Sequence, residues 1–128
     1  MQRASRLIVL VATLSLAAAT MLSAYGFHGL PGKVPAAKIA SWEWANLLHF
    51  LHSIGLIVIA LLLERAPASR LFSAAAALMF AGLVLFSAGI YAEVLGAPAA
   101  IGEVAPFGGQ AFILAWVLTG VATYRLRG

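Results

Sequence analysis

The sequence contains no cysteine and no aspartate. The first absence excludes disulfides, thiolate metal sites and cysteine nucleophiles. The second excludes a Ser-His-Asp arrangement and leaves four acidic residues, which are Glu43, Glu64, Glu93 and Glu103. Because Glu43, Glu93 and Glu103 lie on separate predicted elements near the outer surface, they offer no paired carboxylates for acid-base chemistry. We therefore expect no catalytic residues and a protein that is not an enzyme.

Charge is scarce as well. Charged residues make up 9% of the 128 residues, and hydrophobic residues make up 63%. A soluble domain carries about 25% charged residues. A chain this apolar could not cover itself with polar surface in water, whereas a bilayer removes that requirement. The length allows one domain, so we expect residues 1–128 to form a single transmembrane domain.

Four stretches lack Lys, Arg and Glu for long enough to cross a bilayer, namely residues 7–32, 45–63, 71–92 and 104–124. Crossing takes about 20 apolar residues at roughly 1.5 Å rise each. Glycines and prolines separate the stretches. We predict helices over residues 5–27, 41–64, 70–95 and 107–125, with Ser41 as the N-cap of the second. The predicted fold class is all-α, an up-down bundle of four transmembrane helices.

The positions of the basic residues predict the orientation. One side of the bundle holds Lys33 and Lys38. The other side holds six arginines, which are Arg3, Arg6, Arg65, Arg70, Arg125 and Arg127. Cytoplasmic loops carry the excess of Lys and Arg, so both termini should be cytoplasmic and the protein should lie in the cell (inner) membrane. The basic residues sit at helix ends rather than in a patch, which argues against nucleic acid as a partner.

The first predicted helix has an alternative interpretation. Residues 1–24 resemble a signal peptide, because Arg3 and Arg6 precede an apolar run that ends in small residues. The apolar run, however, continues past the usual length of such a core. We therefore expect this segment to stay in place as a transmembrane helix.

Unusual residues gather in the outer half of the predicted bundle, whereas the inner half is almost featureless. On the second helix, Asn46, His49 and Ser53 fall within about 60° of arc, and His52 lies further round. Ionisable groups inside a membrane are costly unless paired and suggest function. The candidate polar cluster or ligand site comprises His28, Asn46, His49, His52, Ser87, Tyr91, Glu93 and Gln110.

Three interpretations of this cluster stay open. The first is neutral histidines that hydrogen-bond to neighbouring helices and fix the packing. The second is a metal or haem site built from His28, His49 and His52, since imidazole binds Zn, Cu and Fe. The third is a small transporter or channel, with Glu93, the histidines and Gln110 lining a cavity. We predict no cofactor.

Small residues recur at every fourth position of the first helix, at Ser15, Ala19 and Ser23. Such rows let helices approach closely in lipid. Packing within one bundle explains this row. Self-association into a homo-oligomer through a leftover row is the alternative.

Four motifs resemble those of a known family. Residues 23–30, Ser-Ala-Tyr-Gly-Phe-His-Gly-Leu, resemble the family's Gly-Ala-Phe-Gly-Ala-His-Gly-Leu. Residues 48–52 resemble Tyr-x-x-x-His, residues 86–91 resemble Phe-Ser-Gly-Ser-x-Tyr, and residues 106–109 with 115–116 resemble Pro-x-Gly-Gly followed by Gly-Trp. The family is domain of unknown function 423, which includes the YgdD-type bacterial proteins and transmembrane protein 256. The matching motif positions are Gly26, His28, Gly29, His52, Phe86, Ser87, Tyr91, Pro106, Gly108, Gly109 and Trp116.

The resemblance implies a four-helix membrane fold with polar motifs at one end, and no established activity. Two departures affect the polar end. Leu48 replaces the family's tyrosine, and Glu93 stands where the family is usually apolar. We expect a non-catalytic membrane protein that binds the lipid bilayer and a partner or lipid, as an accessory subunit of a larger membrane complex.

Overall fold

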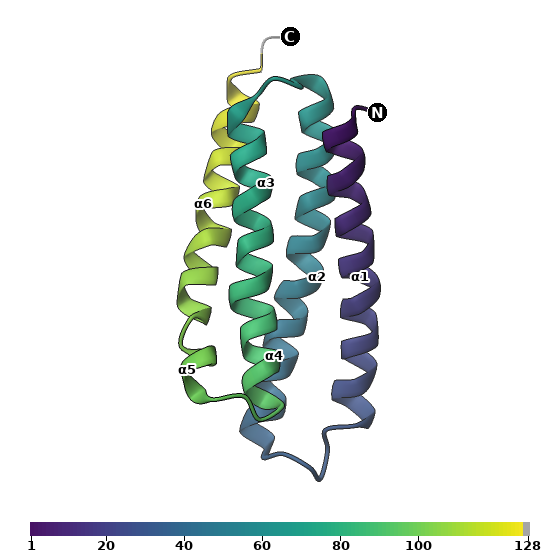
Figure 1. Cartoon of the computed structure of the whole chain (residues 1–128), viewed down its shortest axis with the longest axis vertical. Coiled ribbons are helices and arrows are strands. Elements are labelled where there is room, and N and C mark those ends of the chain that lie inside the picture. The colour runs from purple at the N-terminus through teal and green to yellow at the C-terminus, as the bar shows by residue number, and fades with distance from the viewer. Residues whose placement is uncertain (127–128) are drawn as a thin grey trace.

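The computed structural model describes residues 1–126, and these form long helices that run alternately up and down (Figure 1). The elements are α1 (Arg3–His28), α2 (Ala36–Arg65), α3 (Arg70–Gly82), η1 (Leu83–Ala88), α4 (Gly89–Val94), α5 (Ala99–Gly102) and α6 (Ala105–Tyr124). Four helical segments are long and apolar enough to cross a membrane: α1, α2, the continuous run α3–η1–α4, and α5–α6. The predicted fold class is therefore confirmed. Arg127, one of the six arginines used to predict the orientation, lies outside the described residues.

The predicted start of the second helix is wrong. α2 begins at Ala36 rather than at residue 41, with Pro35 as its N-cap residue. Ser41 lies inside the helix, where its hydroxyl donates to the backbone oxygen of Ala37 at 3.2 Å. Proline fixes a backbone angle that suits a helix start, and the alanines and lysine that follow are good helix formers, so the helix starts directly after Pro35.

The last helix also differs from its predicted start at residue 107. α6 begins at Ala105 and holds Pro106 in its first turn. A proline is tolerated there because the N–H groups of the first turn have no intrahelical partner, so the N–H that proline lacks costs no hydrogen bond. The preceding loop forms the single turn α5.

The predicted helix over residues 70–95 contains a π-helical segment. Residues 83–88 form η1, between α3 and α4. Such segments are frequent at functional sites. η1 carries Ser87, and Tyr91 follows one turn later on α4.

Helix α2 lies at the centre of the molecule. Eleven of its 30 residues are buried, and the main apolar core forms where Leu56 and Ile59 meet Phe72 and Met79 of α3. α3 packs against α6 along its length. α2 thus joins two layers, α1 on one side and α3 with α6 on the other (Figure 1).

Helix α1 attaches to α2 through a seam of small residues. Four of its 26 residues are buried, namely Ser5, Ala12, Ala19 and Gly26, each seven positions from the next. A spacing of seven keeps one face of a helix turned toward a single neighbour. At the far end, a Cβ added to Gly26 would lie 2.5 Å from Nε1 of Trp42, so this glycine makes room for the indole of α2.

Candidate functional site

Buried polar side chains of α2 connect three helices. Asn46, His49 and Ser53 are buried, as their spacing along one face of α2 predicts. Asn46 Nδ2 donates to the backbone oxygen of Ala19 at 2.9 Å and to the hydroxyl of Tyr91 at 3.0 Å. One amide therefore links α1, α2 and α4.

His49 extends this cluster with both of its ring nitrogens. Its Nδ1 lies 3.1 Å from the hydroxyl oxygen of Tyr91, and its Nε2 lies 2.9 Å from Oγ of Ser15. Oγ of Ser15 lies 2.6 Å from Oγ of Ser53. A continuous chain of hydrogen bonds thus runs from Asn46 through Tyr91, His49 and Ser15 to Ser53. We call these five residues the polar latch.

The chemistry of the side chains fixes the direction of one bond in the latch. The amide nitrogen of Asn46 can only donate, so the hydroxyl oxygen of Tyr91 accepts that bond. In the other bonds the hydrogen can lie on either partner, because each ring nitrogen of His49 donates or accepts according to its tautomer and either serine hydroxyl can donate. In both arrangements the two nitrogens of His49 are used inside the protein.

Two further bonds hold backbone carbonyls near the latch. Ser87 Oγ donates to the backbone oxygen of Ala45 at 2.9 Å. Nε1 of Trp42 donates to the backbone oxygen of Leu22 at 2.9 Å, and its ring lies 4.5 Å from that of Tyr91 between centroids. These bonds tie η1 and α1 to α2 on either side of the latch.

His52 faces a different neighbour from His49. Its Nδ1 donates to the backbone oxygen of Leu48 at 2.7 Å. Its ring stacks on Phe112 of α6 with centroids 3.5 Å apart, and the ring of Trp116 lies 6.1 Å away. Within residues 1–126, no hydrogen bond reaches Nε2 of His52. The lone pair on that nitrogen is therefore not engaged by the described part of the chain.

Besides His52 and Ser87, three predicted site residues do not join the latch. His28 and Gln110 are exposed at the surface of α1 and α6. Each lies two positions from a buried residue of its helix, Gly26 and Phe112 respectively, and two positions turn a side chain about 200° away. Glu93 lies on α4 against Gly102 of α5, where an added Cβ would collide with the Glu93 carboxylate. The prediction that His28, Glu93 and Gln110 share one cluster with Asn46, His49 and Tyr91 is therefore wrong.

The separation of the histidines bears on metal binding. Among the residues that the structure describes, no group of three or more His or Glu side chains could hold one metal ion. His28, His49 and His52 together thus do not form a single ligand set. The absence of a cofactor stays a prediction, and so does transport through Glu93, the histidines and Gln110.

Several motif positions have a packing role. A Cβ on Gly108 would lie 2.4 Å from the backbone nitrogen of Phe86, so this glycine lets α6 touch η1. Trp116 packs over Gly55, and Phe86 meets the ring of Phe112 with centroids 5.9 Å apart. These motif residues position the helices around the latch.

Two latch residues, Ser15 and Ser53, are absent from the predicted cluster, although Ser53 was predicted to share a face of the second helix with Asn46 and His49. Ser15 was placed in a row of small packing residues, of which Ala19 is fully buried whereas Ser23 is exposed. A serine within such a row, opposite a histidine on the next helix, is the signal that would have identified it. In lipid, a serine hydroxyl that hydrogen-bonds to another helix stabilises the packing of the two helices in addition to allowing their close approach.

Comparison with known proteins finds a family and relatives that are membrane proteins. The family described as "Protein of unknown function (DUF423)" matches residues 22–109. The UPF0382 membrane protein YwdK of Bacillus subtilis is 32% identical over 94% of this chain and 98% of its own length. A UPF0382 membrane protein of Staphylococcus epidermidis is 31% identical over 96% of this chain and 99% of its own length. No solved structure matches the chain.

Proposed function

This chain belongs to the DUF423 family of membrane proteins, and from that premise we propose that it is a non-catalytic accessory protein that binds another component of its membrane. The polar latch fixes α1 in place, and the exposed surface of α1 makes the contact. In this proposal the protein lies in the inner membrane with both termini cytoplasmic, as the excess of arginines at that end favours.

The observation that carries the proposal is the contrast between the inside and the outside of α1. Its polar contacts in the latch end within the protein: Ser15 meets His49 and Ser53, and the backbone oxygen of Ala19 accepts from Asn46. Its outer surface stays uncovered, with only four of 26 residues buried. A helix that is held firmly on one side and uncovered on the other suits a binding surface for lipid or for another membrane helix.

Native mass spectrometry tests this proposal on protein released from its own membrane in mild detergent. An added protein or phospholipid mass that stays with the chain is the expected result. A bare chain mass in several mild detergents would contradict it. The Tyr91→Phe variant provides the link to the latch: it should lose part of the added mass, because α1 is less firmly held.

A histidine-based cofactor is the second candidate, because one observation favours it. Nδ1 of His52 donates to a backbone oxygen, which orients the ring and leaves Nε2 as a lone pair beside Phe112 and Trp116. Histidines that bind metal or haem iron usually make such a bond with their other nitrogen. An absorption band or a bound metal that disappears in the His52→Ala variant and remains in the His28→Ala variant would support this candidate. Loss of the band or metal in both variants, or its absence from the unaltered chain, would reject the candidate.

A further inference from the structure

We propose that the groove between α1 and α3 at the arginine-rich end holds one acyl chain of an anionic phospholipid, with its phosphate on the arginines at the mouth. This inference rests on the proposed function and names its lipid component. It concerns the end of the bundle opposite to the DUF423 sequence motifs around His28 and Gly108.

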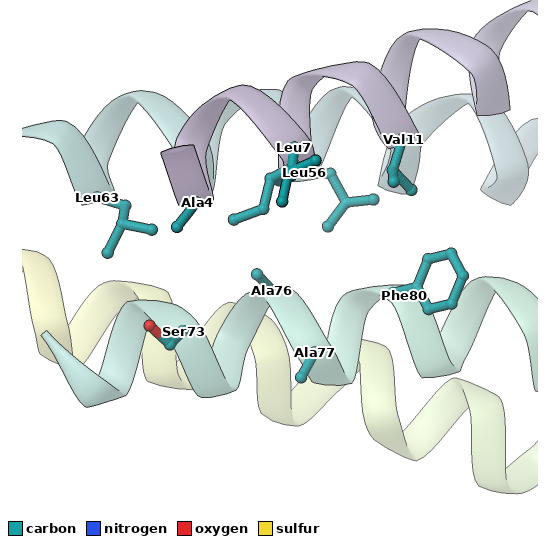
Figure 2. Close-up of a pocket in the computed structure, with 10 residues that line it drawn as sticks. Ala4, Leu7, Val11, Leu56, Leu63, Ser73, Ala76, Ala77 and Phe80 are labelled. Atoms are coloured by element: carbon teal, nitrogen blue, oxygen red, sulfur yellow. The ribbon is translucent and has the colours of Figure 1, made fainter. Parts of the chain in front are cut away.

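The groove exists because α1 touches α2 but stands away from α3. Its floor is α2, and its walls are α1 and α3 (Figure 2). The space measures about 410 Å³, which lies within the roughly 300–1,000 Å³ of typical ligand pockets. Apolar side chains dominate its lining, including Leu7, Val11, Leu56, Leu63, Ala77 and Phe80.

The dimensions favour an acyl chain over a partner helix. On α1 the lining runs from Ala4 to Val11, which corresponds to about 10 Å of helix at 1.5 Å per residue. A second transmembrane helix would need contact along much of the roughly 30 Å hydrocarbon core. Beyond Val11 the latch links α1 to α2 through Ser15, and Asn46 links α1 to α4 by bonding to both Ala19 and Tyr91, so the groove does not extend through the bilayer. A slender hydrocarbon chain fits such a short slot.

The mouth of the groove is positively charged. Arg3 precedes the lining residue Ala4, and Arg70 starts α3 one turn before the lining residue Ser73. Arg3 and Arg6 line an adjoining hollow that shares Leu7 with the groove. Guanidinium groups bind phosphate oxygens through paired hydrogen bonds, so this mouth suits a phosphate group.

Acidic residues do little to offset these arginines. Of the four glutamates in the sequence, Glu64 alone lies at this end, and its Oε1 accepts a bond from the backbone nitrogen of Gln2 at 2.8 Å. Glu43, Glu93 and Glu103 belong to the opposite end of the bundle. The combination of an apolar slot and a basic mouth at one membrane surface matches the two parts of an anionic phospholipid.

Two alanines on α3 provide a matched test. Ala77 lines the groove, whereas Ala74 is exposed on the same helix and does not line it. The full chain is placed in phosphatidylcholine vesicles that contain spin-labelled phosphatidylglycerol, and electron spin resonance reports the immobilised lipid. We expect Ala77→Trp to lower the immobilised fraction at least threefold and Ala74→Trp to leave it unchanged. Equal fractions in the two variants, at equal thermal stability, would overturn the proposal.

The headgroup is tested with the same vesicles. Spin-labelled phosphatidylglycerol should be immobilised at least threefold more than spin-labelled phosphatidylcholine, and the Arg3→Gln/Arg70→Gln variant should lose this preference. Arg125→Gln removes one charge from the same end but not from the mouth, and should keep it. Equal immobilisation of the two lipids by the unaltered chain would contradict the proposal.

A second copy of the chain is the competing occupant. Because the sequence has no cysteine, Leu7→Cys reports on it without background. A disulfide-linked dimer that forms in the vesicles together with loss of immobilised lipid would make the groove an interface between copies. A partner protein found by native mass spectrometry with no lipid immobilised in vesicles would reject the groove while leaving the accessory function in place.

Discussion

Tyr91 joins two other members of the polar latch through a single hydroxyl. That hydroxyl accepts from Asn46 and is hydrogen-bonded to Nδ1 of His49, and the ring of Tyr91 packs against Trp42. An unpaired polar group inside a membrane protein is unfavourable, because lipid offers no replacement partner. The latch therefore depends on each member having its partner in place.

The Tyr91→Phe variant should be less stable by about 1–3 kcal/mol, since it leaves Nδ1 of His49 without its partner. Thermal unfolding in detergent measures the effect. Tyr25→Phe is the matched control, because Tyr25 is exposed and its hydroxyl makes no hydrogen bond within residues 1–126. Equal midpoints for the two variants would show that the hydroxyl of Tyr91 does not hold the latch.

Two adjacent glycines of the fourth motif should respond differently to alanine. A Cβ on Gly108 would lie 2.4 Å from the backbone nitrogen of Phe86, whereas a Cβ on Gly109 would meet nothing within 4 Å. Gly108→Ala should destabilise the protein by about 1–3 kcal/mol through overpacking. Gly109→Ala should be neutral or stabilise by up to about 1 kcal/mol, because alanine favours a helix. Unfolding midpoints in the reverse order would contradict the packing of α6 on η1.

Residue types and helix geometry explain which parts of the site could be predicted. Asn46 and His49 were predicted to face the interior because their spacing on one helix fixes their relative direction. His28 and Gln110 were grouped with them by depth in the membrane, which says nothing about the face of the helix. The seven-residue spacing of the small residues that include Gly26 would have placed His28 on the outer side of α1. The partners of a polar residue on another helix depend on how the helices pack, which one helix does not reveal.

At the scale of elements, α1 depends on a seam of small residues. Ala12 is fully buried in that seam, whereas Ala17 is exposed on the same helix. Ala12→Leu should push α1 away from α2 and destabilise the protein by about 1–3 kcal/mol, and Ala17→Leu should be neutral in lipid. Thermal unfolding compares the two. If both leucines are tolerated equally, the seam does not set the position of α1.

The spans of the four helices could be predicted from runs without charge, because the cost of charges in hydrocarbon limits where helices cross. Their ends were less predictable. Ser41 is a good N-cap by residue type, yet the favourable helix formers after Pro35 extend α2 beyond it. The π-helical η1 had no signal in the local sequence. It lies where Phe112 and Gly108 of α6 press against Gly82 and Phe86, so it accompanies a contact between helices.

At the scale of the whole molecule, the ends of the bundle differ in charge, which predicts the orientation. Single cysteines report it directly because the chain has none. A membrane-impermeant maleimide added to spheroplasts should label Ala100→Cys on α5, but label Ala68→Cys, between α2 and α3, only after lysis. Both positions are exposed in the structure. The opposite labelling pattern would reverse the predicted orientation and move the proposed lipid groove to the other leaflet.

We propose that the chain works by holding another membrane component, and that the histidines outside the latch, His28 and His52, are not needed to hold it. Native mass spectrometry of the His28→Ala/His52→Ala variant, released from its own membrane beside the unaltered chain, tests this most directly. We expect the same added protein or phospholipid mass in both spectra. A bare chain in both, or an added mass that is neither protein nor lipid and that disappears from the variant, would contradict it.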